Sequence, residues 1–430
     1  MNTSKPFVLA LLFGGAAVFS ACGGGSDVEA GYQPVPGAGG SAGSASSGGQ
    51  GGESSGSGAG SGSGAGSGSG GAGGGGGGGE MGPQCPPAGP FDGPVVTAPP
   101  DEWTWVPVKE SLCRDGSESG FGVRLNPASD KVVIYLEGGG ACFNATTCGI
   151  NPGVFGEIAF GGWKGTAGGT GIFNAGKEEN PLRDWNFVYV PYCTGDIHGG
   201  AADHVDVPGL TSPKNQSFMG YVNLGHYLKR LVPTFSSASQ VLLTGISAGG
   251  FGAAYNYDRV SEAFCPIPVT LLDDSGPPMS DKYITPCLQK EWKGLWDLTS
   301  TLPAGCPDCN GPDGGGIVHY VDYIAAKYPK SRLGLISSDK DSIIATFFGF
   351  GKNDCKLAVP LSGAEYSAGL KELRDTYLGK APGWSTYFVD SISHTYLVGP
   401  AFYTTEVDGM KLTEWVGALV NGGDAGHIGP

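Results

Sequence analysis

Short apolar runs alternate with longer amphipathic stretches through most of the chain after residue 100. Runs of this length without polar alternation are typical of strands that are buried on both faces of a sheet. The clearest are Lys131–Leu136, Asn186–Val190, Val241–Gly245, Val269–Leu272, Arg332–Ile336 and Ser385–Val389. Trp103–Val108 and Gly122–Leu125 indicate an opening pair of strands, and residues 217–231 indicate a helix. The pattern predicts an α/β fold with a mostly parallel central sheet and helices on both faces, the plan of an α/β-hydrolase.

The run Val241–Gly245 leads through Ile246-Ser247-Ala248-Gly249 into a segment rich in Ala and Tyr. Strand, sharp turn and helix in this order are the context of a nucleophile elbow, in which flanking glycines leave room for a strained serine. In a chain with 80 glycines, the five-residue pattern alone fits a plain turn equally well. The context makes Ser247 the candidate nucleophile.

The third predicted strand, Lys131–Leu136, runs directly into a glycine-rich loop, Glu137 to Ala141. In an α/β-hydrolase the loop after this strand supplies backbone N–H groups to an oxyanion hole, and glycines allow the close approach that main-chain donors need. A plain turn is the alternative. The position predicts Gly139 and Gly140 as oxyanion donors, together with the N–H of Ala248.

Two acidic clusters follow strands beyond the candidate nucleophile. Asp273 and Asp274 end the sixth predicted strand, whereas Asp339 and Asp341 follow the seventh. The second position is the usual one for the acid in this fold, so we favour Asp341, with Asp339 as the second choice.

The chain order Ser, Asp, His leaves two histidines, His394 and His427, as candidate bases. His394 follows the eighth predicted strand, whereas His427 lies in a Gly-rich tail that we expect to fray. We therefore predict a triad of Ser247, Asp341 and His394.

Residues 1–22 have the pattern of an export signal. Lys5 precedes an apolar run, and small residues precede Cys22, which resembles a bacterial lipoprotein signal with Cys22 as the acylated residue. An ordinary secretory signal cleaved near Ala21 is the alternative. Residues 23–84 are rich in Gly, Ser and Ala and predict a flexible linker. Residues 85–430 then form one domain, at the bacterial outer surface, in the periplasm or secreted.

Charge and cysteine content narrow the function further. The formal net charge of −15 argues against nucleic acid or an acidic membrane surface as the partner. An even number of cysteines from Cys85 onward, in an exported domain, predicts about five disulfides, with Cys142 and Cys148 as a local bridge. Cys306 and Cys309 also have the spacing of a metal or redox pair, but no second such pair completes a zinc site.

Several motifs in one order span nearly the whole domain: Leu136-Glu137-Gly138-Gly139-Gly140 with a cysteine close behind, Tyr192-Cys193-Thr194-Gly195-Asp196, the Ser247 motif, Asp274-Ser275-Gly276, and Asp341-Ser342 ahead of His394. Together these motifs resemble the family of pectin acetylesterases and Notum carboxylesterases. The resemblance implies a serine carboxylesterase with an extra lid region and the triad already named, and it adds Asp196 and His198 as pocket-lining residues.

Two departures from the family pattern concern the substrate. The family often carries an aromatic residue in or beside the glycine run, where this chain has Gly140 and Ala141, and His198 replaces the residues expected there. The resemblance implies an acetylated polysaccharide such as pectin as substrate. The triad mechanism needs no metal or organic cofactor, and we expect a monomer that contacts the membrane only through an N-terminal lipid. The alternatives are a Notum-like deacylase or lipase of longer acyl esters and, in another class, a non-enzymatic surface-binding protein on a hydrolase scaffold.

Overall fold

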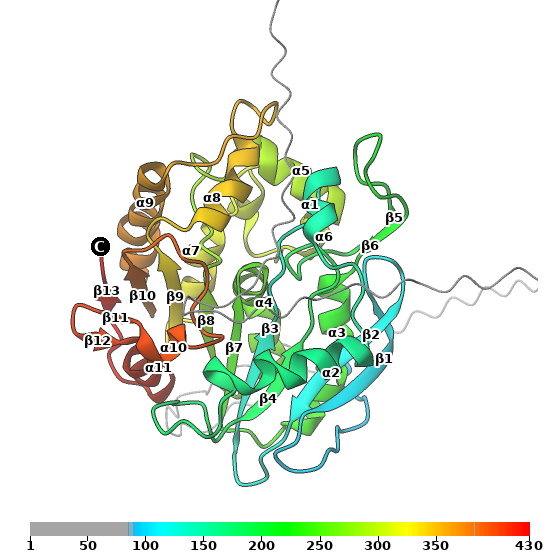
Figure 1. Ribbon diagram of the computed structural model, residues 1–430, viewed down its shortest axis with the longest axis vertical. Helices are drawn as coiled ribbons and strands as arrows, with labels where there is room; N and C mark the ends of the chain where they lie inside the picture. The colour runs from blue at the N-terminus through cyan, green and yellow to red at the C-terminus, as the bar shows by residue number, and fades with distance from the viewer. Residues whose placement is uncertain (1–84, 86–88, 382) are drawn as a thin grey trace, which may run out of the picture. The chain divides into compact units, whose positions relative to one another are not determined.

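The computed structural model describes residue 85, residues 89–381 and residues 383–430. The predicted signal, Cys22 and the predicted linker therefore lie outside the described residues. Within the described part, a nine-stranded sheet runs in the order β1-β2-β4-β3-β7-β8-β9-β10-β13 (Figure 1). Its strands are β1 (Thr104–Leu112), β2 (Glu118–Arg124), β3 (Lys131–Leu136), β4 (Asn186–Val190), β7 (Gln240–Ile246), β8 (Val269–Asp274), β9 (Leu333–Ser338), β10 (Trp384–Val389) and β13 (His427–Ile428).

The first two pairs in this sheet, β1 with β2 and β2 with β4, are antiparallel. Every later pair, from β4 with β3 to β10 with β13, is parallel. This arrangement confirms the predicted α/β fold and its mostly parallel sheet, and the predicted bounds of β3 and β4 match those observed.

Two local details differ from the predictions. The helix predicted from about residue 217 is present as α3 but begins at Gly220, because β6 (Gln216–Phe218) pairs with β5 (Ala202–Val205) just before it. The C-terminal tail does not fray, since β13 pairs with β10 and the Nδ1 atom of His427 lies 3.0 Å from Thr386 Oγ1. A small hairpin, β11 (Glu406–Val407) with β12 (Met410–Lys411), lies between β10 and β13 in the chain.

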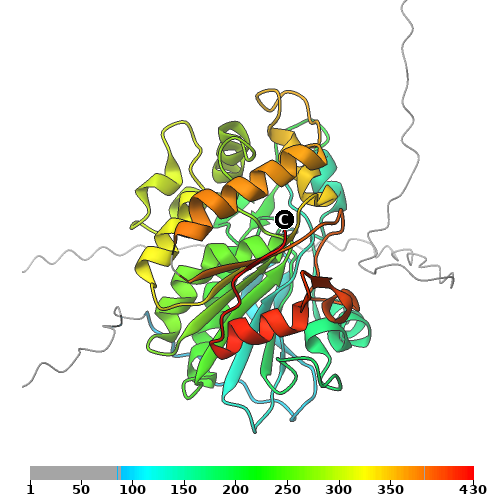
Figure 2. The same cartoon turned by 90° about the vertical axis from the view of Figure 1, so that its left-hand side faces the viewer.

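Alternate side chains of each strand face two apolar clusters, one on either side of the sheet. In β3, Val132 and Ile134 belong to one cluster, and Val133 and Tyr135 to the other. Figure 2 shows α9 and α11 on opposite sides of the sheet. The first side is covered by α3 (Gly220–Thr234), α4 (Ala248–Phe264), α7 (His319–Lys327) and α9 (Gly363–Glu372), and the second by α2 (Glu157–Gly165), α10 (Ala401–Thr404) and α11 (Leu412–Asn421).

The remaining helices gather toward one end of the domain, the upper end in Figure 1. They are α1 (Ala145–Ile150), α5 (Pro286–Trp296), α6 (Leu298–Thr301) and α8 (Ser342–Phe348). They belong to segments that follow the carboxyl ends of β3, β8 and β9. In open α/β sheets this is the edge at which ligands bind.

The cysteines from Cys85 onward form five disulfides, which confirms the predicted number and the local Cys142–Cys148 bridge. Cys306 and Cys309 are bonded to each other, so neither thiolate is left to bind a metal ion. The other bridges are Cys85–Cys265, Cys113–Cys193 and Cys287–Cys355. In the described part of the chain, none of the helices has both the length and the apolar content that crossing a bilayer needs.

Candidate active site

Ser247 occupies the sharp turn between β7 and α4. Its φ of +56° and ψ of −122° are strained for a residue with a side chain. Neighbouring glycines make this turn possible, because a Cβ at Gly245 would lie 2.2 Å from the Gly249 carbonyl oxygen, and one at Gly249 would lie 2.0 Å from that of Leu136. The turn therefore has the backbone of a nucleophile elbow, and Ser247 is buried apart from 8% of its surface.

Asp341 and His394 form a hydrogen-bonded pair. Asp341 caps the N-terminus of α8, where its Oδ1 accepts the N–H groups of Ile343 and Ile344 at 2.9 and 3.0 Å. Its Oδ2 lies 2.7 Å from His394 Nδ1. A proton on Nδ1 leaves Nε2 as an acceptor. This Nε2 is buried and has no hydrogen-bond partner among the described residues.

The alternative acid, Asp339, and the alternative base, His427, contact other residues. Asp339 pairs with Lys340 at 3.1 Å and accepts the N–H of Ser391 at 3.2 Å, while His427 contacts Thr386. No hydrogen bond joins Ser247 to His394 within the described residues, although such bonds are often long before substrate binds. The geometry thus brings the predicted acid and base together and leaves the alternatives outside that pair.

Asp274, at the end of β8, ties the Ser247 turn to the His394 loop. Its backbone carbonyl accepts the N–H of Ser247 at 2.7 Å. Its Oδ2 accepts the N–H groups of Tyr396 and Leu397 at 2.6 and 2.8 Å. The side chain is fully buried, and this burial raises its pKa to about 6 despite those donors. Asp274 therefore fixes the position of the Ser247 turn relative to the His394 loop.

Two side chains hold the carbonyl groups of the glycine loop after β3. Asn151 Nδ2 donates to the Gly139 carbonyl at 2.8 Å, and the Tyr192 hydroxyl donates to the Gly140 carbonyl at 2.9 Å. The C=O and N–H of one trans peptide point in opposite directions, so the first bond turns the Gly140 N–H away from Asn151. Within the described residues, the N–H groups of Gly139 and Gly140 have no acceptor. They remain available as donors to a ligand.

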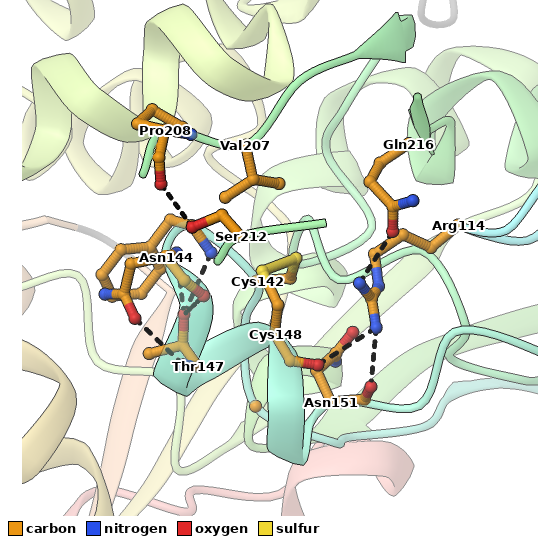
Figure 3. Close-up of a disulfide and its surroundings, with 12 residues drawn as sticks. Arg114, Cys142, Asn144, Thr147, Cys148, Asn151, Val207, Pro208, Ser212 and Gln216 are labelled. Carbon is orange, nitrogen blue, oxygen red and sulfur yellow. Dashed lines mark hydrogen bonds between the residues drawn. A yellow bond between two sulfur atoms is a disulfide. The ribbon is translucent and has the colours of Figure 1, made fainter. Parts of the chain in front are cut away.

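Asn151 is itself braced by a buried arginine. Arg114 Nη2 donates to the backbone carbonyls of Cys148 and Asn151 at 3.2 and 2.9 Å, and its Nη1 donates to Gln216 Oε1 at 2.8 Å (Figure 3). The Cys142–Cys148 bridge, drawn in the same view, joins the end of the glycine loop to α1. This bridge and Arg114 together fix the segment from which Asn151 reaches Gly139.

The pocket-lining role expected for Asp196 and His198 does not hold for the cavity beside Ser247. Asp196 is fully buried and accepts the N–H groups of His198, Gly200 and Gly220 at 3.1, 3.2 and 2.7 Å. His198 Nε2 lies 2.9 Å from the Glu137 carbonyl, and burial lowers the pKa of this histidine to about 4, so it stays neutral. His198 therefore holds the start of the glycine loop, and Asp196 holds the backbone of His198.

The cavity beside Ser247 has a volume of about 40 Å³. Gly140, Ser247 and Ala248 line it together with Ile197, and its wall is otherwise apolar. The aromatic part of that wall comes from Phe251, Trp292, Phe347 and Phe348. A Cβ at Gly140 would lie 3.2 Å from the Phe347 ring, so a helix-borne aromatic residue borders the loop where the family often carries its own.

Sequence reasoning missed Asn151 and the role of Phe347. Asn151 follows a short helix with no motif around it, and only the structure shows its bond to Gly139. Tyr192 did carry a signal, as the first residue of the Tyr-Cys motif, but its contact with Gly140 has no sequence mark. In the described part of the chain, no group of three or more His, Cys, Asp and Glu side chains is placed to hold a metal ion.

Comparison with known proteins gives a consistent picture. A family model described as Pectinacetylesterase matches residues 104–307. A palmitoleoyl-protein carboxylesterase, notum2 of Xenopus laevis, is 35% identical over 153 residues, which cover 35% of this chain and 30% of that relative. An inactive palmitoleoyl-protein carboxylesterase, notum1b of Danio rerio, is 34% identical over 101 residues, which cover 23% of this chain and 71% of that relative.

A solved structure of the Wnt deacylase Notum from Drosophila superposes with a TM-score of 0.53 at 21% identity, covering 74% of this chain and 93% of that one. At that identity the likeness supports the shared fold. The chain spans about a third of the length of most relatives that it matches.

Proposed function

Because this chain belongs to the family of pectinacetylesterases and Notum carboxylesterases, we propose that it is a serine carboxylesterase that removes acetyl groups from a polysaccharide such as pectin. The observation that carries the proposal is a single cavity lined by Ser247, Gly140 and Ala248 and otherwise apolar. A nucleophile, main-chain donors and an apolar wall around one small space fit the acyl part of an ester.

The proposed reaction proceeds through an acyl-enzyme. His394 Nε2 accepts the proton of Ser247 Oγ as that oxygen attacks the ester carbonyl, and then gives the proton to the departing alcohol. Water attacks the acyl-serine, His394 accepts its proton, and the acid leaves as Ser247 Oγ regains a proton. Asp341 holds the imidazole by its Nδ1–H and stabilises the imidazolium. The N–H groups of Gly139, Gly140 and Ala248 hold the oxyanion, each worth about 2.7–4 kcal/mol in the transition state.

Cavity size supports a short acyl group. At about 40 Å³ this cavity is far smaller than the sites that hold drug-sized ligands, and an acetyl group has only three non-hydrogen atoms. A long chain would need the aromatic wall to move. The entirely apolar character of that wall, and the palmitoleoyl substrate in the names of the relatives, favour the second candidate, hydrolysis of longer acyl esters.

The test is hydrolysis of p-nitrophenyl esters from acetate to palmitate, together with release of acetate from acetylated pectin. We expect the highest kcat/KM for acetate, and acetate release that depends on Ser247. Phe347→Ala should move the optimum to longer acyl groups because it enlarges the cavity. Phe350→Ala is the matched control, since Phe350 packs on Phe143 and does not line the cavity. No hydrolysis of any ester would refute the proposal, and an optimum at long chains would favour the second candidate.

We also propose that the enzyme is exported and lipidated at Cys22. Five disulfides support an oxidising compartment, because such bridges persist outside the cytosol. Mass spectrometry of the mature N-terminus tests the lipid: a diacylated Cys22 is expected, and an unmodified N-terminus near Ala21 would indicate an ordinary secretory signal.

A further inference from the structure

The cavity beside Ser247 takes much of its wall from two segments that are far apart in the chain. Trp292 belongs to α5, and Ile284 lies just before that helix. Phe347 and Phe348, also in the wall, belong to α8. The size of the cavity therefore depends on how α8 is held relative to α5.

A loop after α8, residues 352–361 and here called the strap, returns to the helix that precedes it. The N–H of Val359 donates to the Gly349 carbonyl at 3.0 Å, and the N–H of Leu361 donates to the Ala345 carbonyl at 2.9 Å. Ala345 lies within α8, and Gly349 begins the short turn that follows the helix. The far end of the strap is thus bonded to the part of α8 that carries the two phenylalanines.

The Cys287–Cys355 bridge joins the strap to α5. Cys287 is the second residue of α5, and Cys355 lies in the strap. A hydrogen bond from Thr285 Oγ1 to the Gly351 carbonyl, at 3.0 Å, links the same two segments. No other disulfide among the described residues joins them. One covalent bond therefore closes the wall of the cavity between α5 and the chain around α8.

The backbone of the strap is strained at this bridge. Asn353, Asp354 and Cys355 have φ values of +54°, +58° and +58°, so three consecutive residues with side chains are in the left-handed region. Asn and Asp visit this region singly, but such a run persists only where the surrounding structure enforces it. The ion pair of Lys356 with Asp354 is exposed, and exposed pairs contribute little. We therefore expect the strap to relax once the bridge is removed.

The other end of α8, which carries the acid Asp341, is fixed by different contacts. The N–H groups of Lys340 and Ser342 donate to the carbonyls of Ser391 and Ile392 at 3.1 and 3.3 Å. Neither contact involves the strap or α5. Relaxation of the strap can therefore free the aromatic end of α8 while the acid stays in place.

We propose that the Cys287–Cys355 bridge limits the length of the acyl group that the enzyme accepts, by holding the aromatic end of α8 against α5. The inference rests on the proposed function, because acyl selectivity is a property of an esterase. With the bridge removed, Phe347 and Phe348 can move away from Trp292, and the apolar cavity becomes larger. An acetyl group gains nothing from the added space, whereas each further methylene of a longer chain can then be buried.

The test compares kcat/KM for p-nitrophenyl acetate and octanoate in the full chain, with and without Cys287→Ser/Cys355→Ser. We expect the octanoate-to-acetate ratio to rise about tenfold or more, since one methylene in an apolar pocket changes kcat/KM by about 10- to 200-fold. The matched control is Cys85→Ser/Cys265→Ser, which removes a bridge at the C-terminal cap of α4, 17 helical residues away from Ser247. Its ratio should equal that of wild type. A ratio does not depend on the folded fraction, so general destabilisation cannot imitate the effect.

An unchanged ratio after loss of the Cys287–Cys355 bridge, or an equal rise in both double variants, would overturn the proposal. If the first variant does not fold, Thr285→Val removes the neighbouring hydrogen bond to Gly351 and keeps the bridge. It should raise the ratio in the same direction but less, and no rise would again overturn the proposal.

Amide hydrogen exchange of residues 342–361 gives a readout that needs no hydrolysis. Exchange in this segment should be faster without the Cys287–Cys355 bridge and unchanged in the control variant. If the wild-type chain hydrolyses no ester, the proposed function fails, and exchange still reports whether the bridge holds α8. Unchanged exchange would overturn the inference independently of the esterase activity.

Discussion

Replacing Tyr192 with phenylalanine deletes one hydroxyl on which two backbone groups near the oxyanion loop depend. That hydroxyl donates to the Gly140 carbonyl at 2.9 Å and accepts the N–H of Ile197 at 2.9 Å. Tyr192 is fully buried, and burial raises its pKa well above the usual value, so the hydroxyl stays protonated. The variant keeps the ring and removes only the atom that holds the carbonyl of the Gly140–Ala141 peptide, which adjoins the peptide that carries the Gly140 N–H.

Two effects of different size follow. A buried donor and a buried acceptor lose their partner, which costs about 1–3 kcal/mol for each group, and we expect about 2 kcal/mol in total because a water molecule can bridge them. The N–H donors of the glycine loop remain but are held less firmly. One oxyanion donor is worth about 2.7–4 kcal/mol in the transition state, so losing half of that energy lowers kcat by about 10- to 30-fold.

The assay compares kcat, KM and unfolding free energy for wild type, Tyr192→Phe and Tyr257→Phe. Tyr257, a residue of α4, is the matched control, because it is fully buried and donates its hydroxyl to the Val269 carbonyl at 2.8 Å. Both variants should lose stability, but only Tyr192→Phe should lose kcat, with KM unchanged, since the affected contact acts in the transition state. Equal kcat for the two variants, once corrected for folded fraction, would show that Tyr192 has only a structural role.

Three further outcomes test the site and the disulfides. Ser247→Ala should retain less than about a thousandth of the p-nitrophenyl acetate rate while melting like wild type, since loss of a triad nucleophile costs more than that. Asp341→Asn should lower kcat by roughly 10⁴-fold, because His394 is then held in the wrong tautomer, whereas Asp339→Asn should change kcat much less. The reverse ranking in steady-state kinetics would make Asp339 the acid. Titration of the denatured, unreduced exported chain should find no free thiol, and two or more free thiols would contradict the five bridges.

The strands and the Ser247 turn could be predicted from the sequence because each depends on local pattern. Val132–Leu136 and Phe187–Val190 are continuous runs of apolar and aromatic residues, as is typical of strands that are buried on both faces. Glycines are required on either side of Ser247, because an added Cβ at Gly245 or Gly249 would lie within 2.5 Å of a backbone oxygen. The glycine positions in the sequence therefore indicate the turn geometry.

The support of the glycine loop could not be predicted, because it depends on contacts between segments far apart in the chain. Asn151 reaches Gly139 only after α1 is tied by the Cys142–Cys148 bridge and by Arg114, whose own backbone is held by hydrogen bonds to Cys193 and Ser217. The same limit explains Asp196 and His198. Their motif marked them as special, but a motif does not say whether a side chain faces the cavity or, as here, the backbone behind it.

The buried carboxyl of Asp274 makes stability depend on pH. Its pKa rises from an ordinary 3.8 to about 6 on folding, because burial opposes its charged form. The folded state therefore binds the proton more tightly, so this contribution to stability is full below pH ~4 and is lost as pH rises through about 6. The difference between the two pKa values corresponds to about 3 kcal/mol of stability.

The Asp274→Asn side chain cannot ionise and retains an oxygen for the N–H groups of Tyr396 and Leu397. Measured by denaturant unfolding with disulfides intact, its stability relative to wild type should improve by up to that amount between pH 4 and 7. Parallel curves for the two proteins over this range would mean that Asp274 is already ionised in the folded state at pH 4, and that its donors outweigh its burial.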